Sequence, residues 1–151
     1  MFKGDQSDVE FLEHFKKRTG GNYDIIIDDG SHVPSHQKIT FEALWSSVVP
    51  GGYYVIEDLE TSYWKETAEI YGYTFTGQKS LVEHMKLVAD AVNKKYSDFN
   101  SPLPSLYDDI SSIKFGANIA IIQKQTLEER RYFEGPYKHA HDSAGMPLPY
   151  P

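Results

Sequence analysis

The chain contains no cysteine, which excludes disulfide bonds, thiolate zinc sites, iron–sulfur clusters and a cysteine nucleophile. It has no apolar run near the ~20 residues of a membrane span and no signal-peptide core, so we expect a cytoplasmic protein without a membrane partner. Basic residues are few, because 15 Lys and Arg stand against 22 Asp and Glu, for a net charge of −7. Nucleic-acid binding needs clustered basic side chains, and we expect no such partner.

What the chain does have is the composition of one globular domain. Its 151 residues are close to the usual ~150 per domain, and 40% hydrophobic against 25% charged residues is a balance typical of folded proteins. The 11 Tyr and 8 Phe supply bulky side chains for a core. The acidic net charge is compatible with a small neutral substrate or with a bound cation.

A strand–helix–strand unit is predicted in the first half of the chain. The predicted elements are, in order, a helix over 9–18, a strand over 23–28, a helix over 35–49 and a strand over 52–59. Asp8 can cap the first helix, and Gly20 can end it. The isoleucines of 23–28 do not alternate with polar residues, which is typical of a strand buried on both faces of a parallel sheet. Such a unit has a right-handed crossover.

The second half is predicted to contain a helix and a hairpin. The letters SLVE from Ser80 form a capping box, and Leu81, Met85 and Val88 recur at helical spacing. The predicted segments are a loop or short helix over 60–80, a helix from Ser80 to about Lys95, a loop over 97–109, a hairpin around Gly116, Ala117 and Asn118, and a loosely ordered tail over 126–151.

Carboxylates follow both predicted parallel strands. The first strand ends in Asp28 and Asp29, and the second ends in Glu57 and Asp58. Neighbouring strands lie ~4.8 Å apart and ligands bind beyond their carboxyl ends, so these side chains can face one cleft. Oxygen ligands favour Mg²⁺, with Mn²⁺ or Ca²⁺ as alternatives. His32 follows three residues after Asp29, where a neutral imidazole can take a proton from a substrate hydroxyl.

Two other interpretations of these residues stay open. Asp and Gly are ordinary turn residues, and Ser31 or Ser35 can cap the next helix, so one such turn alone carries little information. Asp29, His32 and His36 can also form the two-His-one-carboxylate site of an iron-dependent hydroxylase. That alternative leaves the carboxylates of the second strand without a role. In the tail, His139 and His141 form a further His pair that can bind metal.

Three segments carry a resemblance to a known family: GDQSD, YDIIIDDGSHVPSHQ and GGYYVIEDLETSYW. With them, the chain resembles the macrocin and mycinamicin type sugar O-methyltransferases. These are metal-dependent members of the class I S-adenosylmethionine methyltransferase fold, and some relatives carry the label cephalosporin hydroxylase. The resemblance runs from about Phe2 to Lys124, and Glu57 lies 25 positions after His32, as in the family.

The resemblance implies roles for several residues. These are Asp29, Glu57 and Asp58 as Mg²⁺ ligands, His32 as general base, Asp5 and Gln6 beside the adenine of the cofactor, and Tyr63 and Trp64 next to the substrate. The implied cofactors are S-adenosylmethionine and Mg²⁺, with Mn²⁺ as an alternative. The implied reaction transfers the sulfonium methyl group in line to a hydroxyl of a sugar or other small molecule, after His32 has deprotonated it.

One departure from the family pattern concerns the cofactor pocket. The glycine-rich turn that holds the methionine end of the cofactor is missing, because no GxGxG or GxGxxG occurs in the chain. The resemblance therefore implies an α/β fold that is the C-terminal portion of a Rossmann-like methyltransferase, with a mostly parallel sheet ending in an antiparallel hairpin. We expect a partial methyltransferase domain over 1–125 and a tail over 126–151. A non-catalytic remnant that binds a metal or a partner is the alternative.

The same resemblance has a consequence for assembly. In the family fold, the strand over 23–28 lies beside a first strand that this chain lacks. Its apolar edge would then be unpaired, and an unpaired edge recruits other strands. We therefore expect self-association or pairing with a complementary segment.

Overall fold

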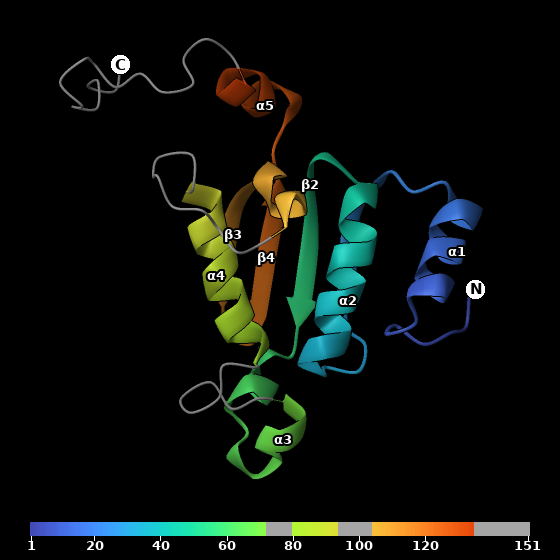
Figure 1. The fold of residues 1–151 in the computed structure, drawn as a ribbon, viewed down its shortest axis with the longest axis vertical. Coiled ribbons are helices and arrows are strands. Elements are labelled where there is room, and N and C mark those ends of the chain that lie inside the picture. The colour runs from blue at the N-terminus through green and yellow to red at the C-terminus, as the bar shows by residue number, and fades with distance from the viewer. Residues whose placement is uncertain (72–79, 94–103, 135–151) are drawn as a thin grey trace, which may run out of the picture.

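A four-stranded mixed sheet is the centre of the described structure (Figure 1). The structure is a computed structural model and describes residues 1–71, 80–93 and 104–134. The strands are β1 (Tyr23–Asp28), β2 (Val48–Glu57), β3 (Ile110–Gly116) and β4 (Ile119–Lys124). They lie in the order β1-β2-β4-β3; β1 and β2 are parallel, and β4 is antiparallel to both of its neighbours. The predicted α/β class and closing hairpin are confirmed.

One described helix precedes the first strand, and the others lie between strands or after the last one. The helices are α1 (Val9–Thr19), α2 (Pro34–Leu44), α3 (Ala68–Tyr71), α4 (Leu81–Asn93) and α5 (Leu127–Glu134), with short 3₁₀ helices η1 (Trp45–Ser47), η2 (Leu59–Tyr63), η3 (Lys65–Thr67) and η5 (Ser105–Asp109). The predicted caps of α1 are confirmed: the Asp8 carboxylate accepts from the backbone N–H of Glu10 and Phe11, and Gly20 ends the helix at a φ of 80°. Ser80 likewise accepts from the backbone N–H of Glu83 at the start of α4.

The connection between α2 and β2 differs from the predicted one. The helix predicted over 35–49 ends at Leu44, and η1 leads into a strand that begins at Val48. Val48 pairs with Tyr23 of β1, so the two valines at 48–49 join the sheet instead of extending the helix. β-branched residues pack well on a pleated surface, which explains why the strand starts early.

Aromatic side chains join α2 to the sheet. Phe41 is fully buried, and its ring centroid lies 5.1 Å from that of Trp45, 4.9 Å from Tyr54 on β2 and 5.7 Å from Tyr107 of η5. Leu81, Met85 and Val88 of α4 belong to the same core. Large rings in contact contribute much of the burial that holds a small domain together, so α2 and β2 are fixed relative to each other.

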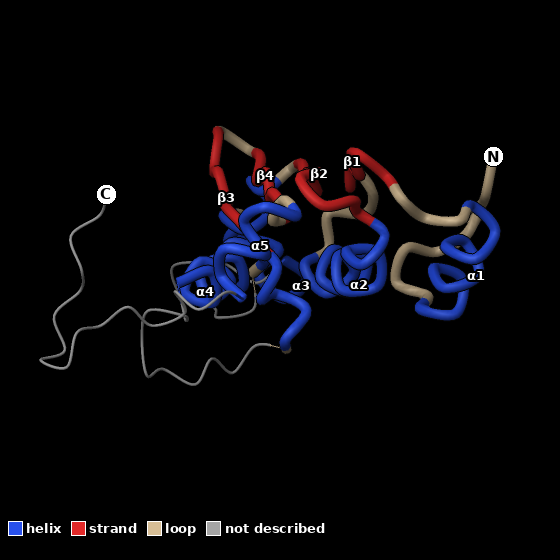
Figure 2. The backbone as a smooth tube through the Cα atoms, turned by 90° about the horizontal axis from the view of Figure 1, so that it is seen from above, coloured by secondary structure: helices blue, strands red, loops and turns tan. Residues whose placement is uncertain are grey.

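The opposite face of the sheet carries no described helix (Figure 2). On this face, Ile25 and Ile27 of β1 are 57% and 60% exposed, and Tyr53 of β2 is 38% exposed. β1 is also an edge strand of the sheet that the described residues form. The expectation that the isoleucine strand is buried on both faces is therefore wrong for the described residues, because the described helices cover only one of the two faces.

The predicted loose tail is helical at its beginning. α5 covers residues 127–134, where the prediction was a segment without regular structure. Residues 135–151, with His139 and His141, lie outside the described residues, as do 72–79 and 94–103. The division of the chain at residue 125 stays a prediction. Among the described residues, no helix has the length and apolar character needed to cross a membrane.

Candidate metal and proton-acceptor site

Three of the predicted site residues meet at the carboxyl ends of β1 and β2. Asp29 and His32 follow β1, and Asp58 follows β2. One ligand atom from each of the three residues lies within 4.8 Å of the other two. Carboxylate oxygens and an imidazole nitrogen at this spacing are a donor set that fits a divalent cation. The strand-end placement predicted from the sequence brings these side chains together.

Asp58 and His32 contact each other directly. The imidazole Nε2 of His32 lies 3.3 Å from Oδ2 of Asp58, and the His32 backbone carbonyl accepts a hydrogen bond of 3.3 Å from the Thr61 hydroxyl on η2. The other ring nitrogen, Nδ1, is buried without a hydrogen-bond partner among the described residues. The segment after β2 thus contacts both the imidazole and the backbone of His32.

The backbone at the site adopts left-handed conformations. His32 and Asp58 each have a φ of 56°, and Asn118 at the hairpin turn has a φ of 64°. Asn22, at 62°, is the remaining non-glycine residue with positive φ in the described part of the chain. Such a conformation costs roughly 1 kcal/mol or more for most residues, but Asn and Asp tolerate it better. His32 is therefore the strained residue of the three, and strain of this kind gathers at functional sites.

The loop between β1 and α2 is held by Gln6. Its amide nitrogen donates to Asp28 Oδ1 and to Thr40 Oγ1, at 3.1 Å each, and its oxygen accepts from the backbone N–H of Ser31. Gly30 leaves no room for a side chain, because a Cβ there would collide with this amide. Gln6 therefore fixes the loop that presents Asp29 and His32.

Asp28 has a structural role. It is 5% exposed, and its carboxylate accepts from Gln6 and from the Tyr54 hydroxyl at 3.2 Å. Burial raises the pKa of this carboxyl, while the hydrogen bonds from Gln6 and Tyr54 oppose the rise. Of the two carboxylates at the end of β1, only Asp29 belongs to the group that can hold a metal.

Glu57 and His36 are not members of the group of three. Glu57 ends β2, and its backbone carbonyl accepts from the side chain of Gln37 at 3.3 Å. Nδ1 of His36 lies 3.0 Å from the Ser31 hydroxyl. The geometry therefore favours two carboxylates with His32 over the set of Asp29, His32 and His36. The assignment of Glu57 as a ligand stays a prediction.

The residues predicted to border the cofactor line a hollow beside this loop. Lys3, Gly4, Asp5, Gln6, Gly30 and Ser31 line a space of ≈ 510 Å³. Asp5 is exposed, and hydrogen bonds from the backbone and hydroxyl of Ser7, at 2.8 and 2.7 Å, lower the pKa of its carboxyl. The Gln6 amide is engaged with protein groups, so its role in the structure is to support the loop.

The chain is similar in sequence to known sugar O-methyltransferases. The chain is 37% identical over 126 residues to mycinamicin VI 2''-O-methyltransferase of Micromonospora griseorubida, covering 77% of the chain. It is 52% identical over 61 residues to demethylmacrocin O-methyltransferase of Streptomyces fradiae, covering 40% of the chain. The chain resembles part of the sugar O-methyltransferases. No family model matches it.

The structural comparison agrees with the sequence similarity to these sugar O-methyltransferases. The MycE methyltransferase from the mycinamycin biosynthetic pathway, solved in complex with Mg, SAH and mycinamycin VI, superimposes with a TM-score of 0.72 and 32% identity over 83% of the chain. The chain spans 31% of that structure, 31% of the mycinamicin relative and 15% of the macrocin relative. The fold of the described residues is that of a part of these methyltransferases.

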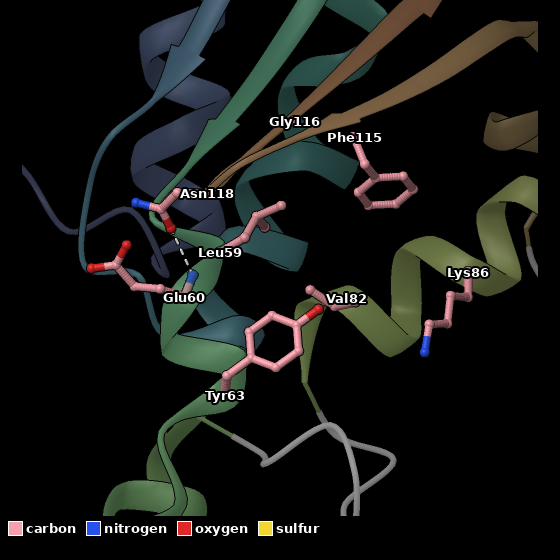
Figure 3. A pocket seen from close by; sticks show the side chains of 8 residues that line it. All are labelled: Leu59, Glu60, Tyr63, Val82, Lys86, Phe115, Gly116 and Asn118. Carbon is pink, nitrogen blue, oxygen red and sulfur yellow. Dashed lines mark hydrogen bonds between the residues drawn. The ribbon is translucent and has the colours of Figure 1, made fainter.

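Asp29, His32 and Asp58 are called the metal group below. A pocket lies next to this group, between η2, α4 and the hairpin (Figure 3). Its volume is ≈ 380 Å³, and Leu59, Glu60, Tyr63, Val82, Lys86, Phe115, Gly116 and Asn118 line it. Tyr63, which the resemblance places next to the substrate, is thus part of the wall. Trp64 is not among the lining residues, and its ring packs edge-on against Tyr71 at 5.4 Å.

Asn118 is a site residue that the sequence analysis missed. Its side-chain amide donates to Asp58 Oδ1 at 2.9 Å, and it also lines the pocket. The sequence indicates that Asn118 lies in a hairpin turn, but it does not indicate where that turn lies. The pairing of Glu57 with Ile119 shows that the turn lies at the carboxyl end of β2.

Proposed function

We propose that this chain carries the metal-binding and proton-accepting part of an S-adenosylmethionine-dependent, Mg²⁺-assisted O-methyltransferase. The acceptor is a hydroxyl of a sugar or other small molecule. The observation that carries the proposal is the convergence of Asp29, His32 and Asp58 within 4.8 Å, in a chain similar to sugar O-methyltransferases. The mycinamycin-pathway relative was solved with Mg and SAH, which supports the same pair of cofactors for this site.

Three carboxylates are the proposed Mg²⁺ ligands. Asp29 and Asp58 supply oxygen donors of the kind that Mg²⁺ prefers. Glu57 is the third, because the register that pairs Asp28 with Ile56 makes Glu57 the next neighbour of Asp29 across the two strands. Mn²⁺ is the alternative cation, since it accepts the same ligands.

The chain's own residues prepare the hydroxyl for reaction. When bound, the cation supplies positive charge that acidifies a nearby hydroxyl, and S-adenosylmethionine supplies the methyl group. His32 accepts the hydroxyl proton at Nε2, and Asp58 Oδ2, 3.3 Å away, stabilises the imidazolium. The hydrogen bonds of Gln6 and Thr61 hold His32 and its loop in place, so little reorganisation is needed.

The acceptor is proposed to occupy the pocket next to Asp58. Tyr63 lines it, and Asn118 connects it with the carboxylate group. Trp64 is exposed nearby in the chain and is proposed to border the same substrate. Asp5 and Gln6 line the hollow on the other side of the β1 loop, where we propose that the adenine end of the cofactor binds. The cytoplasmic location stays a prediction from the sequence.

The metal site can be tested on the chain itself. Mg²⁺ or Mn²⁺ should raise the melting temperature, because a cation relieves the repulsion between Asp29 and Asp58 and binds only the folded state. Asp29→Asn should reduce this shift. Asp24→Asn is the matched control, since Asp24 is an exposed carboxylate of the same strand outside the group. An equal metal response of Asp29→Asn and wild type would show that the carboxylate group is not the metal site.

A second candidate function is a non-catalytic, partner-binding role. The exposed face of the sheet with Ile25, Ile27 and Tyr53 favours it, because apolar side chains on a sheet are normally covered. We propose that this face packs against a second copy of the chain or a complementary segment. Partner binding by this face would not by itself block the metal group, since the face and the metal group are formed by different side chains.

A further inference from the structure

We infer that Asn118 is a positioning residue for the metal group: its side-chain amide orients the carboxylate of Asp58. The inference rests on the proposed function, in which Asp58 is a ligand. Asn118 belongs to the turn between β3 and β4 and is distant in sequence from the other residues of the group. Its contacts are with the segment 58–60, directly after β2.

Three hydrogen bonds connect Asn118 with this segment. Its backbone carbonyl accepts from the N–H of Leu59 at 3.3 Å, and its side-chain oxygen accepts from the N–H of Glu60 at 2.7 Å (Figure 3). Its side-chain nitrogen donates to Oδ1 of Asp58 at 2.9 Å. The side chain therefore uses both ends of its amide, and the acceptor end fixes the orientation of the donor end.

The consequence is that the two oxygens of Asp58 have different surroundings. Oδ1 accepts from Asn118, while Oδ2 lies 3.3 Å from His32. An aspartate side chain rotates about two bonds, and without a partner on Oδ1 only the contact of Oδ2 with His32 would oppose that rotation. An amide N–H suits the task because it is a neutral donor: it holds the carboxylate without neutralising its charge, and it does not compete for the cation.

The conformation of Asn118 provides a clean way to remove the amide. Its φ of 64° is accessible to asparagine and glycine and strained for most other residues. Asn118→Gly therefore deletes the side chain while the turn keeps its backbone. The chain also offers a matched control in Asn22, which has a φ of 62° and whose amide contacts the Gly20 carbonyl at 3.4 Å, away from the metal group. Asn22→Gly makes the same chemical change elsewhere.

The first measurement is the affinity for Mn²⁺, determined with the metal alone by electron paramagnetic resonance of the free ion. Partners that orient a ligand contribute about 10- to 100-fold to metal affinity, so Asn118→Gly should weaken Mn²⁺ binding by that factor. Asn22→Gly should bind as the wild type does. A general loss of stability would lower the melting temperature of the metal-free variant but not the affinity of its folded form. Equal Mn²⁺ affinity of Asn118→Gly and wild type would overturn the inference and leave the proposed function intact.

The second measurement does not depend on the metal. At one fixed pH and without metal, the ring ¹⁵N signals of His32 report the carboxylate that lies beside Nε2. The chemical shifts of these signals should differ from those of the wild type in Asn118→Gly and equal them in Asn22→Gly. If the wild type binds no Mn²⁺, the metal part of the proposed function fails, and a moved His32 signal still supports the orienting role. Unmoved His32 signals in Asn118→Gly contradict that role whether or not the metal binds.

Discussion

Asp28 and Asp29 are neighbours with different tasks. Asp28 is buried and bonded to Gln6 and Tyr54, whereas Asp29 is exposed and belongs to the metal group. Asp28 is the last residue of β1, and its side chain points to the face of the sheet that the helices cover. Asp29 lies beyond the strand, in the loop that carries His32. The carboxylate pair at this strand end thus combines one structural residue with one that we propose as a metal ligand.

His84 is a half-buried titratable residue outside the metal group. Tyr107 donates its hydroxyl proton to Glu42 Oε1 at 2.8 Å, so the hydroxyl oxygen accepts from Nε2–H of His84 at 3.0 Å. Burial lowers the pKa of His84 below its ordinary value of 6.5, the charge of Lys38 adds to this, and Glu42 opposes it. The folded protein therefore binds a proton here less readily than the unfolded chain does.

This shift gives stability a pH dependence. Since the pKa of His84 is lower in the folded state, the neutral imidazole contributes fully to the free energy of unfolding above pH 6.5. This contribution is lost as the pH falls below 6.5 toward the pKa of the folded state. His84→Gln should make the free energy of unfolding depend less on pH in this range, because a glutamine amide can donate to Tyr107 without titrating. Urea unfolding at a series of pH values measures the slope. His14→Gln, at an exposed position of α1, is the control, and identical slopes for His84→Gln and wild type would contradict the prediction.

The metal group was predictable from the sequence only in part. Asp29, His32 and Asp58 follow strands that are recognisable from local patterns, and the parallel pairing then brings them together. Asn118 was not predictable in this way, because its contact with Asp58 depends on β4 lying beside β2 in the sheet. The supporting role of Gln6 likewise depends on how the segment before α1 folds back over the β1 loop.

At the scale of elements, α5 shows how a short local signal can be overlooked. Thr126 and Glu129 form a reciprocal capping box: the Thr126 hydroxyl accepts from the N–H of Glu129 at 3.1 Å, and the Glu129 carboxylate accepts from the N–H of Thr126 at 2.8 Å. Arg130 also reaches Asp109 at 3.2 Å. The spacing of Thr126 and Glu129 was visible in the sequence, but the segment lacks apolar periodicity, and that absence suggested a loose tail.

The capping box makes a prediction for α5. Thr126→Ala should destabilise this helix by about 1 kcal/mol, because it removes the hydroxyl that satisfies a free N–H in the first turn. Amide hydrogen exchange over 127–134 should then become faster, while exchange in β2 and β4 stays unchanged. Thr126→Ser keeps the hydroxyl and should exchange as the wild type does. Equal protection of α5 in Thr126→Ala and wild type would mean that other contacts hold the helix instead, such as Arg130 with Asp109 and the Ser111 hydroxyl that donates to Glu129 at 2.6 Å.

For the whole molecule, the arrangement of layers is the main departure from the sequence-based picture. Alternation on β1 and β2 sends Ile26 and Tyr54 toward the helices and Ile25, Ile27 and Tyr53 to the open face. A strand of three isoleucines fits a sheet covered on both sides, and the described residues cover one side only. The prediction of a strand buried on both faces is therefore wrong for the described residues, because the run of isoleucines does not reveal whether both faces of the sheet are covered.

The open face leads to a prediction about assembly. Within the described sheet, β1 is an edge strand, and its exposed isoleucines lie next to Tyr53. Among the described residues, an edge without a partner strand therefore adjoins an apolar surface. The chain should therefore associate with itself, and its sedimentation coefficient should rise with concentration. The double variant Ile25→Ser and Ile27→Ser should weaken this association. Ile70→Ser is the matched control, because Ile70 on α3 is 57% exposed, as Ile25 is. A wild-type chain that sediments as a monomer at all concentrations and melts in one sharp transition would show that the edge and the face are stable in water as they are.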